Sequence, residues 1–163
     1  MFPEDIEQLA ERVLALAREQ GVTLATVESC TGGLVAGALT AIPGSSDVVD
    51  RGFVTYSNTA KAALVGVPQA MLEQYGAVSE PVARAMAEGG LTEADVGMAV
   101  AITGVAGPGG GSDDKPVGLV HFAVARAGFP TAHREMRFGD IGREEVRLES
   151  VRTALEMLAE GLS

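Results

Sequence analysis

Apolar residues recur at spacings of three and four from Ile6 to Ala17, acidic residues precede them, and Gly21 follows. This pattern predicts an amphipathic helix that ends at Gly21. Residues 22–27 are β-branched and largely apolar, which predicts a buried strand. The same two patterns alternate along the rest of the chain. They predict strands over 52–56, 96–102, 117–125 and 131–138, and helices over 33–42, over 59–65, from Pro68 to just before Gly76, from Ser79 to the pair Gly89–Gly90, and through Leu148 to Leu162.

Helices that alternate with continuous apolar strands indicate an α/β sandwich, with a mostly parallel sheet and helices on both faces. A right-handed crossover through residues 33–42 should make the first two strands parallel. The last three predicted strands have no helix between them, so at least one should run antiparallel. If the third strand is parallel to the first two, the segments 29–33, 56–61 and 103–111 meet at one edge of the sheet. Ligands of open α/β sheets bind at that edge.

Ser29 is the first candidate for chemistry at this edge. It leaves the first strand and precedes a helix entered through Thr31, Gly32 and Gly33, so its hydroxyl lies near the positive end of a helix dipole. Free N–H groups there could stabilise an oxyanion or bind a phosphate. The alternative is a serine that only forms the turn or caps the helix. Cys30 is a rival nucleophile, but it has no obvious histidine partner and we expect it to be buried.

Lys61 is the candidate base for this serine. With Asn58 as helix cap, Lys61 occupies the third helical position, where the dipole and partial burial both disfavour the ammonium form. The alternative is a solvated surface lysine. Tyr56 ends the second strand and either contacts the pair or packs. We expect His121 to be a core residue and His133 a surface residue, so a Ser-His-Asp triad is not supported.

The glycine-rich segment 104–112 resembles a phosphate-binding loop, but it matches neither the Walker pattern nor a dinucleotide fingerprint. It could equally be a flexible connection. Arg143 and Arg147 lie one turn apart on the last helix and could pair with a phosphate or carboxylate. Alternatively they belong to a solvated face with ion pairs to Glu144 or Glu149.

Composition limits the class of protein. The 163 residues suit one compact domain. The single cysteine excludes an intramolecular disulfide, and one cysteine with two histidines disfavours a structural zinc site. The formal charge of −10 argues against nucleic-acid binding. No run of about 20 apolar residues predicts a membrane span, and we recognise no signal peptide. We therefore expect a cytoplasmic protein that binds neither nucleic acid nor membrane.

Four ordered stretches resemble those of a known family: Thr26–Gly33, Val54–Lys61, Gly76–Ala83, and Thr103–Gly110 with Lys115–Gly118; Pro43–Ser46 lies at the expected place between the first two. The family is the C-terminal domain of the competence/damage-inducible protein CinA, whose members include the stand-alone nicotinamide mononucleotide deamidases. The resemblance covers essentially the whole chain.

The resemblance implies a three-layer α/β/α sandwich with a five-stranded mixed, mostly parallel sheet, assembled as a homodimer or larger homo-oligomer. It implies that residues 1–163 form a single amidohydrolase domain. That domain would convert nicotinamide mononucleotide, a small nucleotide substrate, to nicotinate mononucleotide and ammonia without metal or cofactor.

The family's serine and lysine fall on Ser29 and Lys61, its tyrosine on Tyr56, and its C-terminal arginine on Arg147, with Arg143 as the alternative. We predict that the substrate is contacted by Thr31, Gly32, Gly33, Thr103, Gly104, Gly107, Gly109, Gly110, Arg143 and Arg147.

Two other functions stay open. A non-catalytic nucleotide-binding module of a competence or DNA-damage response would need phosphate donors but no poised serine and lysine. An amidase that acts on another substrate would keep the pair and change the pocket.

Overall fold

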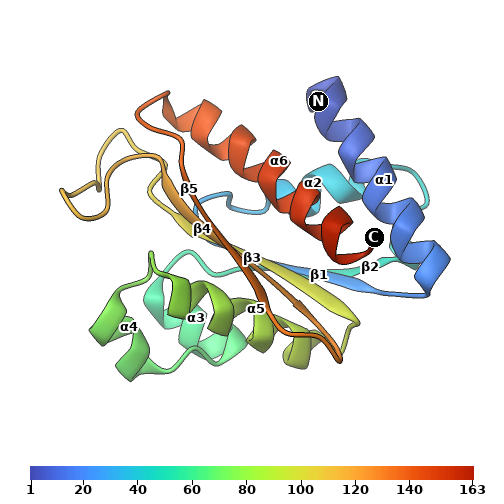
Figure 1. Cartoon of the computed structure of the whole chain (residues 1–163), viewed down its shortest axis with the longest axis horizontal. Helices are drawn as coiled ribbons and strands as arrows, with labels where there is room; N and C mark the ends of the chain where they lie inside the picture. The colour runs from blue at the N-terminus through green and yellow to red at the C-terminus, as the bar shows by residue number, and fades with distance from the viewer.

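The computed structural model covers residues 1–163, and its centre is a five-stranded sheet of order β2-β1-β3-β4-β5 (Figure 1). The strands are β1 (Leu24–Glu28), β2 (Val49–Val54), β3 (Met98–Gly104), β4 (Leu119–Arg126) and β5 (Ala132–Arg137). The helices are α1 (Glu4–Gln20), α2 (Leu34–Thr40), α3 (Asn58–Val65), α4 (Gln69–Tyr75), α5 (Glu80–Ala94) and α6 (Arg143–Gly161), with a 3₁₀ turn at Ser45–Asp47.

The sheet is mixed, as predicted. β1 pairs with β2 and β3 in parallel, whereas β4 runs antiparallel to both β3 and β5. The three parallel strands therefore end at one edge of the sheet. Because β5 runs in the direction of β3, helix α6 begins at that edge as well.

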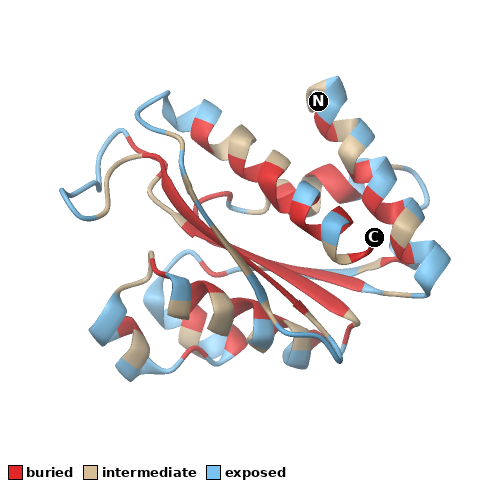
Figure 2. Ribbon diagram, in the orientation of Figure 1, coloured by how far each residue is buried: buried red, intermediate tan, exposed pale blue.

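Helices cover both faces of the sheet, which gives the expected three-layer fold (Figure 1). Helices α1, α2 and α6 pack on one face and α3, α4 and α5 lie on the other. The two central strands β1 and β3 are buried along almost their whole length (Figure 2), and β4 likewise, because side chains of both faces meet a helical layer. This is why these strands are almost continuously apolar in sequence.

Gly89 and Gly90 do not end a helix, and that expectation was wrong. Helix α5 continues through them to Ala94 because they allow close packing. A Cβ atom at position 89 would lie 1.8 Å from the carbonyl oxygen of Val65, and one at position 90 would lie 2.3 Å from Cγ2 of Val27. The two glycines let α5 approach both α3 and the sheet.

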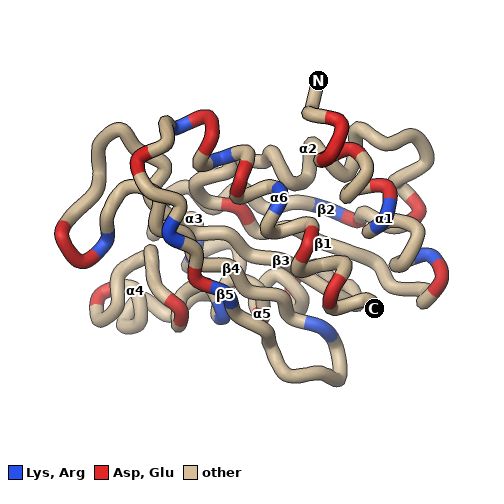
Figure 3. Tube along the Cα trace, turned by 45° about the horizontal axis from the view of Figure 1, so that its top comes forward, with Lys and Arg blue, Asp and Glu red and all other residues tan.

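Lys and Arg positions are scattered along the Cα trace and form no continuous basic segment (Figure 3). The 12 Lys and Arg residues are interspersed among the 22 Asp and Glu residues, in keeping with the formal charge of −10. None of the helices combines the length and the apolar character that crossing a membrane requires.

Candidate active site

A pocket of about 320 Å³ lies at the edge where the parallel strands end, lined by the segments that follow β1, β2 and β3 and by the start of α6. Of the predicted site residues, those lining the pocket are Ser29, Tyr56, Lys61, Thr103, Gly104, Gly107, Gly109, Gly110 and Arg143. Thr31, Gly32, Gly33 and Arg147 are not among the lining residues.

Ser29 and Lys61 form the centre of the pocket. Side chains alternate along β1, so Ser29 points to the face covered by α3, from which Lys61 projects. The backbone N–H of Ser29 continues the ladder by donating to the carbonyl of Ile102 at 2.9 Å. Nζ of Lys61 lies 3.1 Å from Oγ of Ser29. The predicted nucleophile and the predicted base are thus within hydrogen-bond distance, although 32 residues separate them in sequence.

The start of α3 differs from the prediction. The N-cap is Ser57, whose hydroxyl accepts a hydrogen bond from the N–H of Ala60 at 3.0 Å, and not Asn58. Lys61 is therefore the fourth helical residue and not the third, which weakens the dipole argument because the dipole's influence decreases beyond the first turn. Asn58 lines the pocket instead.

Burial is the main influence on the Lys61 amine. The side chain is only 1% exposed, and its single protein acceptor besides Ser29 is the carbonyl of Thr55, at 2.8 Å. Desolvation lowers the pKa of Lys61 below its ordinary value because it disfavours the ammonium form. A lysine with a lowered pKa can accept the Ser29 proton.

Cys30 is a poor nucleophile here. It is buried, and desolvation raises the pKa of its thiol to about 12. The thiolate is the reactive form, so this cysteine stays protonated at neutral pH.

Arg143 and Tyr56 close one side of the pocket. Nη1 of Arg143 donates to the carbonyl of Gly107 at 2.8 Å, and Nη2 donates to the Tyr56 hydroxyl at 3.0 Å. Tyr56 is 61% exposed, so its ring lies at the mouth and not in the core. Arg143, the first residue of α6, therefore connects the end of β2 with the glycine-rich segment.

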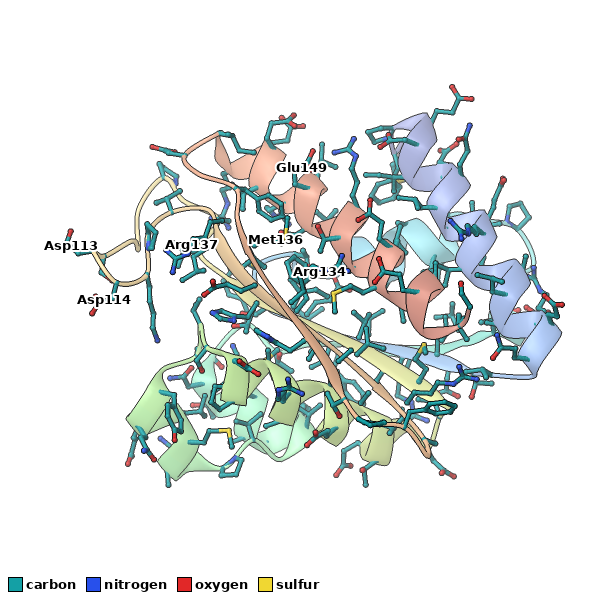
Figure 4. All side chains as sticks on the ribbon, viewed as in Figure 1. Asp113, Asp114, Arg134, Met136, Arg137 and Glu149 are labelled. Carbon is teal, nitrogen blue, oxygen red and sulfur yellow. The ribbon has the colours of Figure 1, made fainter.

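The glycine-rich segment gives the pocket a wall of backbone. Gly107 and Gly110 have φ of +82° and +83°, which other residues rarely adopt. The N–H groups of Gly109 and Gly110 donate to no protein acceptor, so they are available to a ligand. The tip of the segment, with Asp113 and Asp114, extends away from the body of the molecule (Figure 4).

Arg147 holds the Ser29 turn from the opposite side. Its Nε donates to the carbonyl of Cys30 at 3.1 Å and its Nη2 to that of Thr31 at 3.3 Å. Gly32, at φ +58°, lies directly beneath this guanidinium group. The structure thus places the two arginines differently: Arg143 lines the pocket and Arg147 contacts the backbone of the turn.

The histidines form a pair that sequence reasoning missed. Nδ1 of His121 lies 2.9 Å from Nε2 of His133, and the two rings stack. Each ring has a carboxylate at 3.6 Å, from Glu135 and Glu80 respectively. His133 is therefore partly buried and not a surface residue. No group of three or more His, Cys, Asp or Glu side chains is placed to hold a metal ion.

No sequence-based prediction gave Glu28 a role, yet its carboxylate anchors the Ser29 turn. It is 1% exposed and accepts from the hydroxyl of Thr31 at 2.7 Å and from the N–H of Val35 at 2.9 Å. A lone acidic residue at the end of an apolar strand, just before a predicted helix start, was the available signal.

Comparisons with known proteins agree with this geometry. The model of the CinA C-terminal domain matches residues 6–162. A crystal structure of the competence/damage inducible protein CihA from Agrobacterium tumefaciens has 56% identity and a TM-score of 0.96, and the match covers 99% of this chain and 98% of that one.

Among curated relatives, a putative competence-damage inducible protein from Symbiobacterium thermophilum is 55% identical over 78% of this chain and 30% of its own length. The nicotinamide-nucleotide amidohydrolase PncC of Escherichia coli K12 is 49% identical over 97% of this chain and 95% of its own length. The chain spans only 30% to 38% of the length of the first curated relatives it matches. The length and identity of these matches show that the chain belongs to the CinA C-terminal domain family.

Proposed function

We propose that this protein is a nicotinamide-nucleotide amidase that hydrolyses nicotinamide mononucleotide to nicotinate mononucleotide and ammonia. The observation that carries the proposal is the 3.1 Å contact between the buried Lys61 amine and the Ser29 hydroxyl. A module that only binds a nucleotide needs phosphate donors but no such pair. The name and 49% identity of the E. coli relative support this choice of substrate over another amide.

Ser29 acts as the nucleophile and neutral Lys61 as the general base. Lys61 takes the hydroxyl proton while Ser29 Oγ attacks the carboxamide carbon, forming a tetrahedral oxyanion. The N–H group of Cys30, a residue that lines the pocket, donates to no protein acceptor and is the donor we assign to that oxyanion. Protonated Lys61 then gives its proton to the departing ammonia. Water, deprotonated by the same amine, cleaves the acyl-enzyme and restores Ser29.

The glycine-rich segment and Arg143 hold the phosphate of the substrate. The free N–H groups of Gly109 and Gly110 and the guanidinium of Arg143 line the same pocket. A pocket of about 320 Å³ lies within the range of about 300–1,000 Å³ usual for small-molecule sites. Of the two arginines that the sequence left open, Arg143 is the one we assign to the phosphate, because Arg143 lines the pocket and Arg147 does not.

Ammonia release from nicotinamide mononucleotide tests the proposal. We expect wild-type protein to release ammonia and Ser29→Ala to release none, whereas Cys30→Ala should keep at least about half of the wild-type rate. A wild-type protein that binds the nucleotide without releasing ammonia would favour the binding module. Equal kcat/KM on nicotinamide riboside, which lacks the phosphate, would rule out the phosphate site.

We also propose the domain organisation, assembly, location and cofactor independence of the protein. Residues 1–163 act as one catalytic domain, assembled as a homodimer or larger homo-oligomer in the cytoplasm and needing neither metal nor cofactor. The resemblance to the family supports these statements.

A further inference from the structure

Glu28 is the only buried carboxylate of the chain, and it immediately precedes the candidate nucleophile. No Lys, Arg or His side chain pairs with it. A carboxylate removed from water is strongly destabilising unless hydrogen bonds compensate for the lost hydration. The hydrogen-bond partners of the Glu28 carboxylate therefore indicate its role.

All four partners of the Glu28 carboxylate are hydrogen-bond donors. Oε1 accepts from the Thr31 hydroxyl at 2.7 Å and the Val35 N–H at 2.9 Å. Oε2 accepts from the Ala36 N–H at 3.0 Å and the Thr26 hydroxyl at 3.2 Å. Four donors suit an acceptor-only group such as a carboxylate, and an amide could not satisfy all of them.

Three of these donors lie beyond Ser29 in sequence, so the carboxylate closes the Ser29 turn. Gly33, the N-cap of α2, has no side chain, and no side chain of its own turn caps the helix. Glu28 supplies that cap from the end of β1 and binds the turn again through Thr31. The backbone on both sides of Ser29 is thereby attached to one rigid group.

The main chain of the same residue reaches the other half of the pair. The carbonyl of Glu28 accepts from the N–H of Thr55 at 2.7 Å, and the carbonyl of Thr55 accepts from Lys61 Nζ at 2.8 Å. Glu28 thus lies at the junction between the backbone that carries Ser29 and the backbone that orients Lys61.

We propose that Glu28 is a positioning residue that holds Ser29 Oγ in line with Lys61 through its bonds to Thr31 and the start of α2. The inference rests on the proposed function, in which Ser29 is the nucleophile. Displacement of a reacting group by about 1 Å can reduce turnover about 100-fold while ground-state binding changes little. The effect should therefore appear in kcat and not in KM.

The test uses three variants of the full chain. Glu28→Gln keeps the shape but places an amide donor against donors, and we expect a 10- to 100-fold lower kcat with KM within about 3-fold. Thr31→Val and Thr26→Val form a matched pair: both residues are fully buried and each loses one hydroxyl bond to the same carboxylate. Only Thr31 belongs to the Ser29 turn, so Thr31→Val should lower kcat about 5-fold or more and Thr26→Val less than 2-fold.

Equal effects of Thr31→Val and Thr26→Val would overturn the proposal, even if Glu28→Gln fails to fold. So would a folded Glu28→Gln protein with more than half of the wild-type kcat. The cavity variant Leu39→Ala in α2 is a stability control, and we expect its kcat to fall only in proportion to the fraction of unfolded protein. If the kcat of Glu28→Gln falls in that way too, Glu28 has a structural role alone.

A second readout separates this inference from the choice of substrate. A fluorophosphonate reacts with an activated serine: Ser29 Oγ bonds to phosphorus, fluoride leaves and the proton passes to Lys61. If the wild type is labelled at Ser29 but releases no ammonia, the proposed substrate is wrong. The role of Glu28 is then tested by the labelling rates of the three variants, which should decrease in the same order as expected for kcat. A wild type that shows neither reaction overturns both proposals.

Discussion

Replacing Lys61 by Arg tests the central requirement that the base loses its proton. Nζ of Lys61 lies between Ser29 Oγ at 3.1 Å and the Thr55 carbonyl at 2.8 Å in a site where the side chain is 1% exposed. A guanidinium group keeps the charge but cannot be deprotonated in a protein. General-base catalysis contributes about 10²- to 10⁴-fold, or about 2.7–5.4 kcal/mol at 1.36 kcal/mol per decade. We therefore expect Lys61→Arg to lose at least about 100-fold in kcat.

The assay is ammonia release as a function of pH. Burial lowers the pKa of Lys61 from its ordinary value of 10.5, so the acid limb of the wild-type kcat/KM profile should report a group below that value. Activity is present above the lowered pKa and lost as pH falls through it, because only the neutral amine accepts a proton. Lys115→Arg is the matched control, since Lys115 is the only other lysine and lies outside the pocket. A Lys61→Arg enzyme with more than a tenth of the wild-type kcat would refute the base role.

Three further predictions use other parts of the structure. Arg143→Ala should raise KM for nicotinamide mononucleotide about 10-fold or more and leave KM for the riboside unchanged. Arg147→Ala, which frees the carbonyls of Cys30 and Thr31, should instead lower kcat on both substrates. Identical behaviour of the two variants would contradict our assignment. Gly89→Ala should lower the free energy of unfolding, measured by urea titration, by about 1–3 kcal/mol, because the new Cβ meets the Val65 carbonyl. Gly37→Ala is the control: its Cβ makes only ordinary contact with Phe2, so the variant should be neutral or more stable by up to about 1 kcal/mol. Burial lowers the pKa of both His121 and His133 below 6.5, so the unfolded chain takes up protons first as the pH falls, and the free energy of unfolding should decrease below about pH 6.5. The double variant His121→Gln/His133→Gln should remove this part of the dependence of stability on pH. An unchanged pH dependence would exclude the histidine pair as its source.

The order of elements and the mixed sheet could be predicted because the central strands are apolar on both faces and the helices are amphipathic. The boundaries of the edge strand could not. The second strand was expected over 52–56 but spans Val49–Val54. Asp50 and Arg51 are exposed at the edge of the sheet, so no apolar pattern marks them. Arg51 belongs to the strand because it pairs with Ala25 of β1, and Asp50 lies at the register irregularity just before that pair. Hydrogen bonding to a neighbour defines an edge strand more than its own composition does.

The candidate pair could also be predicted, since a serine after one parallel strand and a lysine after the next converge at one sheet edge. The histidine pair could not, because it depends on the register of an antiparallel ladder. His133 lies opposite Ala123 and His121 opposite Glu135, so the two rings are diagonal neighbours on one face. A shift of one residue would send His133 to the other face, and β5 is too polar for an apolar pattern to indicate its register.

The alternation of β1 explains why the site needs both helical layers. Glu28 and Ser29 are consecutive, so their side chains point to opposite faces of the sheet. Glu28 meets the N-terminus of α2 in one layer, and Ser29 meets Lys61 of α3 in the other. In our proposal, α2 orients Ser29 through Glu28 although Ser29 does not face it, and α3, which Ser29 does face, supplies the base. Any change that moves α2 along the sheet should therefore alter the distance between Ser29 Oγ and Lys61 Nζ.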